Sequence, residues 1–512
     1  MKIPTTIGAA AWASLLAHLS LAAVPDCPFP GPAFPKPTKL TSSENFKSVL
    51  ANLTETFKGA TEIPRTTPTA RPEVNGDTIY RLGSLTKIFT ILTFLIEAGD
   101  GYWNTPITKF VPELALLADK YQYDPVMNVD WAGITLGELA SHTAGIVRDY
   151  ALLGELTQEN NQTVLESQGF PPAPINETPL CGEWITCNRA QLFKGLGNVP
   201  PSFSTAWTVG YSNVGYQILS YALEAITGKK FANMLQSDVI DKLGLEHTYY
   251  QKPPDNLGII VQGQQSGWNY SLGDASPGQL PWGVKRIPLS NGSGGSRITD
   301  AYNKAGSINA YSSLIILLPD YDVGITVLLA GGWPGNANWN IADAIGETLV
   351  PALEEAARME AGAMYAGTYS SNSSSDTNSA SLNSTIVLST ESGRPGLGID
   401  RWISNGTDMV PVAIRYTLNY NVTGPALRLY PTGLEKRNED GSRKVAFKAM
   451  IQDRGATDHV SDMFSTNCGT WVGQTTAVYA SMPLDQFVFH LDADGGVKSI
   501  EPLALRAVLE KD

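Results

Sequence analysis

Apolar side chains recur every three or four positions in several stretches of the chain, and this spacing predicts amphipathic helices. The stretches cover residues 42–57, 84–98, 213–227 and 339–364. The second is followed by Gly-Asp-Gly and the third by a single glycine, which are common residues just past a helix end. We therefore expect four helices in the part of the chain before residue 366.

The spacing of apolar side chains changes at residues 308–330, where two continuous apolar runs flank a Pro-Asp-Tyr-Asp sequence. Two buried strands joined by such a turn predict a β-hairpin. Residues 370–384 are rich in Ser, Asn and Thr, and the chain after them has short strand-like runs separated by turns. These changes place a domain boundary near residue 366, followed by a β-rich domain over residues 367–512.

The first 23 residues have the pattern of a secretory signal peptide. Lys2 precedes an apolar stretch over residues 7–21, and small residues at Ser20 and Ala22 suit a cleavage site. We predict a secreted protein, extracellular or vacuolar, whose first folded domain covers residues 24–366. Nine Asn-x-Ser/Thr sequons agree with secretion and predict glycosylation, at Asn52, Asn161, Asn176, Asn269, Asn291, Asn372, Asn383, Asn405 and Asn421.

The four cysteines also suit an oxidising compartment. Cys181 and Cys187 could close a short loop, which leaves Cys27 to pair with Cys468. Four buried thiols are the alternative, and secretion makes that alternative the less favoured one.

The charge pattern narrows the class of partner. The chain of 512 residues has a net charge of −13, spread along the sequence rather than gathered in a tail. Because no basic patch is present, we expect a small-molecule substrate rather than nucleic acid or a membrane, and the oligomeric state stays open. We expect no cofactor and no metal, because the histidines after the signal peptide are too scattered for a zinc site, at His142, His247, His459 and His490.

The candidate chemistry begins at Ser84 and Lys87, which are three residues apart at a predicted helix start. This spacing places the hydroxyl and the amine on one face of a helix. A serine hydroxyl needs a base within hydrogen-bond reach, and burial can lower the pKa of a lysine enough for that task. A lone Ser-x-x-Lys match occurs by chance, so other elements have to support it. The chain contains no Gly-x-Ser-x-Gly sequence, so the catalytic triad of an α/β-hydrolase is not supported.

Further sequence elements follow in order. They are Arg81-Leu-Gly-Ser-Leu-Thr-Lys87, Ser141-His-Thr-Ala-Gly145, Tyr211-Ser-Asn213 and Lys304-Ala-Gly306. Residues 40–365 thereby resemble the serine β-lactamases and penicillin-binding proteins, in particular class C β-lactamases and their DD-peptidase and esterase relatives. The resemblance is closest to secreted fungal members. It implies an α+β fold, in which helices and a helical subdomain flank an antiparallel sheet.

The resemblance also implies roles for individual residues. Ser84 would attack a carbonyl, while Lys87 and Tyr211 move its proton. Tyr211 would activate water or an alcohol, provided that nearby lysines lower its pKa. The implied substrate-binding residues are Asn213, Lys304, Gly306 and Ser307, with the N–H groups of Ser84 and Ser307 as the oxyanion hole. His142 is expected to be a structural loop residue.

Three departures from the family pattern stand out. Ala305 replaces the usual threonine, which weakens a β-lactam or peptidyl-D-alanine substrate relative to a general ester or amide. Residues 58–75 contain three prolines where relatives have two strands, and the sequence near residues 277–280 lacks a further helix. Both places look like excised blocks. Either coding sequence has been read as introns, or this protein has lost these elements.

These observations predict a secreted serine hydrolase that acts on an ester or amide through an acyl-enzyme on Ser84. One alternative is a transacylase of natural-product biosynthesis, because only the acyl acceptor would differ. Another is a non-catalytic, glycosylated binding protein on a degenerate scaffold, which the two apparent gaps favour. The intact Ser84, Lys87, Tyr211 and Asn213 favour the enzyme.

Overall fold

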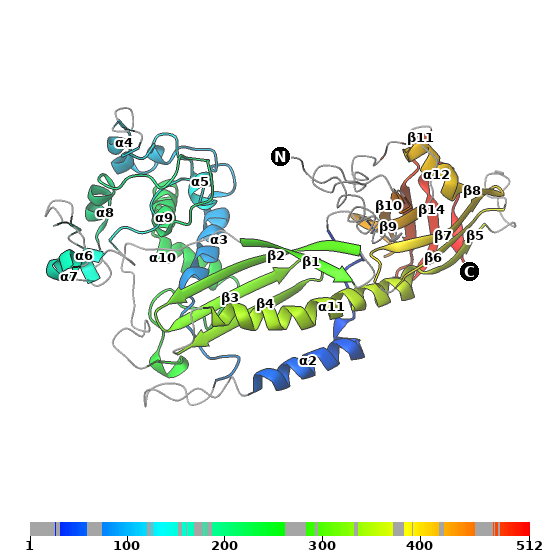
Figure 1. Ribbon diagram of the computed structural model, residues 1–512, viewed down its shortest axis with the longest axis horizontal. Coiled ribbons are helices and arrows are strands. Elements are labelled where there is room, and N and C mark those ends of the chain that lie inside the picture. Colours follow the sequence, from blue (N-terminus) through cyan, green and yellow to red (C-terminus); the bar gives the residue numbers. More distant parts are fainter. Residues whose placement is uncertain are drawn as a thin grey trace, which may run out of the picture.

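The structure is a computed structural model. It describes residues 26, 31–58, 74–119, 124, 126–151, 156–159, 161–167, 171, 178–179, 181, 187–261, 283–291, 295–331, 336–371, 383–391, 393–418, 424–455, 475, 477–479 and 482–512. Figure 1 shows a helical region at the left, a four-stranded sheet with a long helix in the middle, and a β-rich region at the right. The predicted signal peptide and most of the two suspected gap regions lie outside the described residues.

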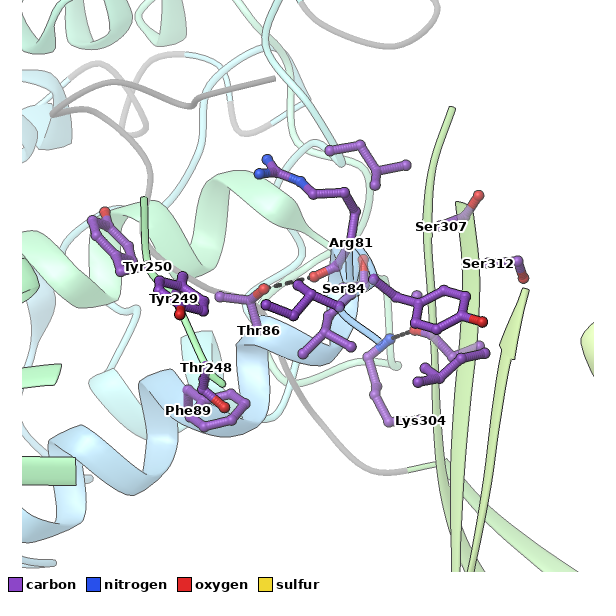
Figure 2. Close-up of a pocket in the computed structure, with 18 of the residues that line it drawn as sticks. Arg81, Ser84, Thr86, Phe89, Thr248, Tyr249, Tyr250, Lys304, Ser307 and Ser312 are labelled. Carbon is purple, nitrogen blue, oxygen red and sulfur yellow. Dashed lines mark hydrogen bonds between the residues drawn. The ribbon is translucent and has the colours of Figure 1, made fainter. Parts of the chain in front are cut away.

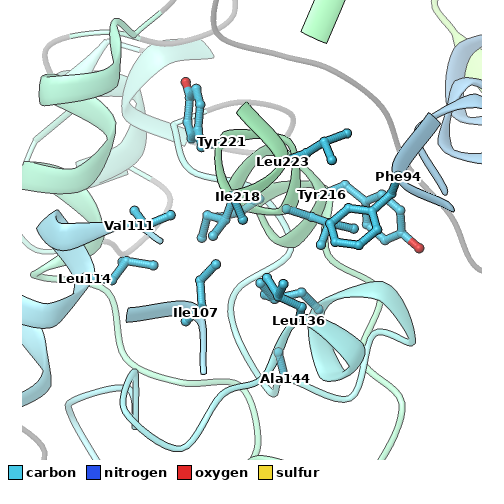
Figure 3. Packing of buried hydrophobic residues seen from close by; sticks show 14 of the residues in the cluster. Phe94, Ile107, Val111, Leu114, Leu136, Ala144, Tyr216, Ile218, Tyr221 and Leu223 are labelled. Carbon is cyan, nitrogen blue, oxygen red and sulfur yellow. The ribbon is translucent and has the colours of Figure 1, made fainter. Parts of the chain in front are cut away.

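The helical region surrounds a central helix, α9 (Asn213–Thr227), which begins after Ser212 and ends at Gly228. Nine of its residues are buried, because its sequence is apolar on more than one face. The helical elements of the chain from residue 86 to residue 257, besides α9, are α3 (Thr86–Ala98), η4 (Ile107–Lys109), α4 (Pro112–Ala118), α5 (Leu136–Ala140), α6 (Leu156–Glu159), α7 (Gln162–Ser167), α8 (Arg189–Leu196), α10 (Phe231–Met234), η6 (Leu235–Ile240) and η7 (Asp255–Leu257). The α9 helix contacts α3, α5 and α10. Figure 3 shows Phe94 of α3 and Leu136 of α5 packed against Tyr216 and Ile218 of α9.

The four-stranded sheet is antiparallel, in the order β1-β2-β3-β4. Its strands are β1 (Gly283–Asn291), β2 (Gly295–Ile308), β3 (Tyr311–Leu318) and β4 (Val323–Ala330). The predicted hairpin is therefore confirmed as β3 and β4, which pair from Leu318↔Val323 to Tyr311↔Ala330. Among the described residues, β1 and β4 form the two edges of this sheet.

One face of this sheet is covered by α11 (Ala337–Tyr365), and α2 (Glu44–Phe57) packs against α11 (Figure 1). The short helix η1 (Leu40–Ser42) leads into α2. Leu314 of β3, Leu353 of α11 and Phe46 of α2 lie in one buried cluster. The four helices expected from periodicity are confirmed, with bounds that differ from the expected ones by two residues or fewer.

The C-terminal region is a nine-stranded sheet in the order β6-β5-β15-β14-β13-β10-β9-β7-β8, and α12 packs on it. The elements of this sheet and its helices are β5 (Gly367–Ser370), β6 (Thr385–Ser389), β7 (Leu397–Ser404), β8 (Thr407–Asp408), α12 (Met409–Leu418), β9 (Pro425–Arg437), β10 (Arg443–Asp453), β13 (Gln486–Leu491), β14 (Val497–Pro502), η10 (Leu503–Leu505) and β15 (Leu509–Lys511). A separate two-stranded sheet pairs β11 (Val478–Tyr479) with β12 (Met482–Pro483). The predicted α+β fold with a β-rich C-terminal region is thus confirmed.

The chain before α2 packs on the C-terminal region. Phe34 is buried in the same cluster as Leu397 and Phe487 of that region. Asp26 is also buried, and both of its carboxylate oxygens accept hydrogen bonds from Arg394 at 2.8 Å. Residues near the start of the described chain therefore contribute to the core of the last domain, and the domain limits given above stay a prediction. Among the described residues, no helix has both the length and the apolar character that a membrane crossing needs.

Candidate active site

Ser84 and Lys87 lie at the junction of η3 (Gly83–Leu85) with α3. The amine Nζ of Lys87 lies 3.2 Å from Oγ of Ser84, within hydrogen-bond reach. The hydroxyls of Ser84 and Tyr211 are 2.8 Å apart, and Lys87 Nζ also contacts the Tyr211 hydroxyl. Asn213 Oδ1 accepts a fourth hydrogen bond in this group, from Lys87 Nζ at 2.9 Å. Side chains 124 to 127 residues apart in sequence thus form one hydrogen-bonded cluster.

The start of α9 positions Tyr211 and Asn213. Ser212 caps the helix, because its Oγ accepts a hydrogen bond from Gly215 N at 2.9 Å. The same hydroxyl donates to the carbonyl of Val147 at 2.7 Å, and Asn213 N donates to the carbonyl of Arg148 at 2.7 Å. These bonds tie the helix start to the loop over residues 147–149.

The environment of Lys87 disfavours its charged form. Its side chain is fully buried, and this burial lowers the pKa of Lys87 to about 4. The positive charge of Lys304 adds to the lowering, Asp149 opposes it, and Arg148 contributes a smaller lowering. Lys87 is therefore a neutral amine at neutral pH, with a lone pair that can accept a proton.

Tyr211 behaves in the opposite way to our expectation. Burial raises the pKa of Tyr211 to about 12, and the hydrogen bond from Ser84 offsets only part of this rise. The expected lowering of its pKa is therefore wrong, because desolvation of the phenolate outweighs the lowering by the Ser84 hydrogen bond and by the charge of Arg148. Tyr211 keeps its proton at neutral pH and can pass one on, whereas Lys87 is the group that can accept one.

Lys304 lies on β2, and its ammonium is 5.4 Å from the centre of the Tyr211 ring. Burial lowers the pKa of Lys304 to about 8, so most of these side chains are charged at neutral pH. Its Nζ donates to the carbonyl of Ala305. Lys304 lines the same cavity as Ser84, and its positive charge suits a substrate that is negatively charged or becomes so during reaction.

Two glycines allow η3 to pack directly on β2. A Cβ added at Gly306 would lie 2.8 Å from Ser84 N, and one added at Gly83 would lie 2.8 Å from Ser307 N. Ser313 of β3 donates a hydrogen bond to the Leu82 carbonyl at 2.7 Å, which holds the same contact. The backbone N–H groups of Ser84 and Ser307 are thereby brought to neighbouring positions, as an oxyanion hole requires.

A cavity of about 930 Å³ opens over the Ser84 hydroxyl. Figure 2 shows Ser84 between the segment that carries Thr248, Tyr249 and Tyr250 and the strands that carry Ser307 and Ser312. Both apolar or aromatic side chains and charged groups line this cavity. The apolar lining includes Phe89, Val214, Leu235, Ile240, Tyr249 and Tyr250, and the charged lining includes Arg81, Arg148, Asp149 and Lys304.

His142 packs directly against the Ser84–Lys87–Tyr211 cluster, which the sequence did not indicate. Its ring is buried, its centre is 4.6 Å from that of the Tyr211 ring, and its Nδ1 accepts a hydrogen bond from Ser212 N at 3.2 Å. Burial and the charge of Lys87 lower the pKa of His142 to about 3, so the ring is neutral. Its Nε2 is buried without a hydrogen-bond partner among the described residues. His142 therefore supports Tyr211 and is no general base.

Sequence reasoning missed Asp149. Its carboxylate accepts a hydrogen bond from Asn213 Nδ2 at 2.5 Å and contacts Arg148 Nε at 3.0 Å. An Arg-Asp pair in a predicted loop carries no motif of its own. Only its position four residues after the Ser-His-Thr-Ala-Gly element could have drawn attention to it.

The Cys181–Cys187 disulfide is confirmed, and the Cys27–Cys468 pair lies outside the described residues. Four of the predicted glycosylation sites are exposed, at Asn52, Asn161, Asn383 and Asn405. Of the other five, Asn176, Asn269, Asn372 and Asn421 lie outside the described residues, and only the backbone is described at Asn291. In the described part of the chain, no group of three or more His, Cys, Asp or Glu side chains could hold a metal ion.

Comparison with known proteins gives two family matches. Residues 65–258 match the beta-lactamase family, and residues 357–512 match a "Beta-lactamase-like-like, C-terminal domain" family. The first region contains Ser84, Lys87, Tyr211 and Asn213. A class C β-lactamase of known structure has 17% sequence identity and a TM-score of 0.36, over 54% of this chain and 84% of that one.

Fungal proteins align with most of the chain. A "Beta-lactamase-like protein" of Arthroderma benhamiae is 25% identical over 96% of this chain and 97% of its own length. A "Probable hydrolase" of Phoma sp. is 23% identical over 83% of this chain and 76% of its own length. The Arthroderma alignment extends over 589 positions, whereas 96% of this chain is about 490 residues, so roughly 100 positions lie opposite gaps in this chain. With one match around the Ser84 cluster and the other on the C-terminal sheet, the chain contains two beta-lactamase-like family-model domains and is similar to fungal beta-lactamase-like proteins.

Proposed function

We propose that this protein is a secreted serine hydrolase that opens an ester or amide through an acyl-enzyme on Ser84. The observation that carries the proposal is the position of Lys87. Its buried amine, with a pKa of about 4, lies within hydrogen-bond reach of Ser84 Oγ, Tyr211 Oη and Asn213 Oδ1. A neutral amine beside a serine hydroxyl is what a nucleophilic serine needs.

In the proposed acylation, Ser84 Oγ forms a bond to the substrate carbonyl carbon. Its proton moves to the lone pair of Lys87, either directly over 3.2 Å or through the Tyr211 hydroxyl at 2.8 Å. The negative charge on the carbonyl oxygen is stabilised by the N–H groups of Ser84 and Ser307. When the tetrahedral intermediate collapses, the bond to the leaving alcohol or amine breaks, and that group takes the proton from Lys87.

Deacylation uses the same groups in reverse. A water molecule gives one proton to Lys87 while its oxygen attacks the acyl carbon, and Ser84 leaves and recovers that proton. An alcohol or amine in place of water would transfer the acyl group instead. The cavity of about 930 Å³ has room for an acceptor beside an acyl group, which keeps the transacylase as the second candidate.

Secretion is supported by three independent features. The signal-peptide pattern of the first 23 residues, the Cys181–Cys187 disulfide and the exposed sequons all suit the secretory pathway. The hydrogen-bonded cluster counts against the non-catalytic binding protein, because a buried lysine amine is difficult to explain in a purely structural role.

Covalent labelling tests the nucleophile. After incubation with a fluorophosphonate, intact-mass analysis and peptide mapping should find one adduct, on the peptide that contains Ser84. Ser84→Ala should abolish labelling, because the attacking oxygen is gone. Ser237→Ala removes a hydroxyl that donates to the Asn233 carbonyl at 2.9 Å and should be labelled like the wild type. Adducts elsewhere that persist in Ser84→Ala would overturn the proposal.

A substrate panel separates hydrolysis from acyl transfer. Chromogenic acyl esters should give a burst of leaving group and an acyl adduct on Ser84. Adding alcohols or amines at increasing concentration should leave the product as free acid if water is the acceptor. Formation of the new ester or amide at the expense of the acid would identify the protein as a transacylase.

A further inference from the structure

We propose that Asp149 is a positioning residue that holds the side-chain amide of Asn213 with its oxygen toward Lys87. This inference rests on the proposed function of Ser84 and adds to it a group that does not touch the reacting atoms. Asp149 acts only through Asn213. By fixing the orientation of the Asn213 amide, it affects how readily Lys87 accepts a proton.

The geometry forms a chain of two hydrogen bonds. Asp149 Oδ1 accepts from Asn213 Nδ2 at 2.5 Å, and on the other side Asn213 Oδ1 accepts from Lys87 Nζ at 2.9 Å. An ionised carboxylate can only accept hydrogen bonds, so it requires the NH₂ end of the amide. The amide oxygen must then point the opposite way, toward the lysine.

The carboxylate is held in place by its surroundings. The Asp149 side chain is only 6% exposed, and its second oxygen contacts Arg148 Nε at 3.0 Å. Backbone bonds from Asn213 and Val214 to the Arg148 carbonyl, at 2.7 and 3.3 Å, fasten this loop to the start of α9. Loop and helix start therefore move together, and the amide has one stable orientation.

This orientation matters because a neutral amine has two N–H donors and one lone pair. With the Asn213 oxygen facing it, Lys87 uses one N–H on that oxygen and keeps its lone pair for the hydroxyls of Ser84 and Tyr211. A reversed amide would present an N–H donor to Lys87 instead. That donor would compete for the lone pair, and the base would be blocked without any change in the fold.

Charge provides a second, measurable consequence. The groups that face Lys87 are Ser84, Tyr211, Asn213, His142, Lys304, Arg148 and Asp149. Among them the negative charge of Asp149 raises the pKa of Lys87, whereas the positive charge of Arg148 lowers it. Because the neutral amine is the active form, the labelling rate should fall as the pH drops below the pKa of Lys87. This falling part of the plot of rate against pH, the acid limb, therefore follows the pKa of Lys87. Loss of the two charges should move this limb in opposite directions.

The test compares four variants by fluorophosphonate labelling rate from pH 3.5 to 8, with thermal unfolding measured in parallel. Asp149→Asn should lower the labelling rate at pH 7 by about 10-fold or more and move the acid limb to lower pH. Arg148→Gln keeps the bond between Asp149 and Asn213, so its rate at pH 7 should fall less than that of Asp149→Asn, and its acid limb should move to higher pH, in the opposite direction.

Asp26→Asn is the matched control. It also removes a buried carboxylate that pairs with an arginine, but in the C-terminal region. It should lower the melting temperature and leave the pH profile of labelling unchanged. Glu at position 149 keeps the carboxylate, so Asp149→Glu should recover part of the rate lost in Asp149→Asn.

The inference is overturned if Asp149→Asn labels at the wild-type rate, or if its rate falls only in step with stability while the acid limb stays in place. In either case Ser84 would still be labelled in the wild type, so the proposed function would stand. If the wild type is not labelled at Ser84, the proposed function itself fails, and the two failures are therefore distinguishable.

Discussion

Burial sets the protonation state of each residue around Ser84. Lys87, Tyr211 and His142 each lose the solvent that would stabilise their charged forms, so the lysine and histidine are neutral at neutral pH and the tyrosine keeps its proton. Lys304 alone of these four is mostly charged at neutral pH, because its pKa falls only to about 8. One base, one proton carrier and one cation thus result from four neighbouring side chains.

The proposed roles of Lys87 as proton acceptor and Tyr211 as proton carrier predict how their variants behave. Lys87→Ala and Tyr211→Phe should each slow acylation of Ser84 by about 10²–10⁴-fold, because each removes one group from the proton path. The double variant should lose much less than the product of the two, since the groups act as a unit. Single-turnover labelling kinetics measure all three rates. Wild-type rates in both single variants would leave the assignment without support.

The pKa of Lys304 predicts a pH dependence of substrate recognition. Below about pH 8 the ammonium is charged and should attract a carboxylate on the substrate, and the attraction should disappear as pH rises through that value. We expect the KM of a carboxylate-bearing ester, relative to its uncharged analogue, to increase several-fold between pH 7 and 9.5. Lys304→Met should make the ratio independent of pH. A ratio that is constant in the wild type would show that Lys304 does not recognise a carboxylate.

Among the elements, η3 and β2 approach each other closely. Backbone meets backbone there, because neither Gly83 nor Gly306 has a Cβ, and the Ser313 hydroxyl reaches Leu82 across the contact. In the proposed reaction, this approach would bring the N–H groups of a helix start and a strand to the same carbonyl oxygen of a substrate. The helix would then supply the nucleophile, and the strand the second half of the oxyanion hole.

A methyl group at Gly306 should separate these two elements. Gly306→Ala would place Cβ 2.8 Å from Ser84 N, so η3 has to shift and the two donors diverge. Loss of one oxyanion donor lowers rates by about 10²–10³-fold in other serine hydrolases, and we expect a fall of that order in esterase kcat. Gly324→Ala on β4 is the control, because its Cβ would meet Leu317 at an ordinary 3.5 Å. Equal kcat values in the two variants would contradict this account of the contact.

Across the whole molecule, the first described residues bind the last domain. The buried pair of Asp26 with Arg394, the packing of Phe34 in the C-terminal core and hydrogen bonds from Thr38 N to Glu360 of α11 form a continuous connection. Residues near both ends of the chain therefore stabilise the C-terminal region, while the intervening chain builds the site.

The two apparent gaps lead to a prediction about stability. Among the described residues, β4 is an edge strand of the four-stranded sheet, and α11 packs against β3 and β4. The family resemblance of the sequence implies two further strands in the region of residues 58–75. Each buried unpaired backbone group costs about 1–3 kcal/mol, so a few would remove much of a typical folding free energy of 5–15 kcal/mol. We expect a version with the missing blocks restored to be more stable and more active. The roughly 100 alignment positions that lie opposite gaps agree with missing blocks.

Transcript sequencing tests this directly. Reads that continue through both places, near residues 58–75 and 277–280, would show that coding sequence has been read as introns. Thermal unfolding and fluorophosphonate labelling would then compare the short and the restored proteins. If only the short transcript exists, and its product is secreted, unfolds cooperatively and labels at Ser84, then the scaffold tolerates both losses.

Local sequence determined the helices, the β3–β4 hairpin, the β-rich C-terminal region and the short-range Cys181–Cys187 disulfide. Helical periodicity and turn residues act over a few positions, so residues 84–98 and 213–227 could be identified without tertiary contacts. The spacing of Ser84 and Lys87 likewise follows from one helix turn. The grouping of Tyr211 and Asn213 with them came from a family resemblance, because these residues are more than a hundred positions away.

Tertiary structure alone decided the electrostatics and the supporting contacts. The pKa of Tyr211 depends on how completely the phenol is desolvated, and burial depends on elements from distant parts of the chain. The hydrogen bond of Asp149 to Asn213 and the packing of Phe34 on the C-terminal core also join residues far apart in sequence. No local pattern encodes such pairs, because their contact is set by how α9, the preceding loop and the sheets pack together.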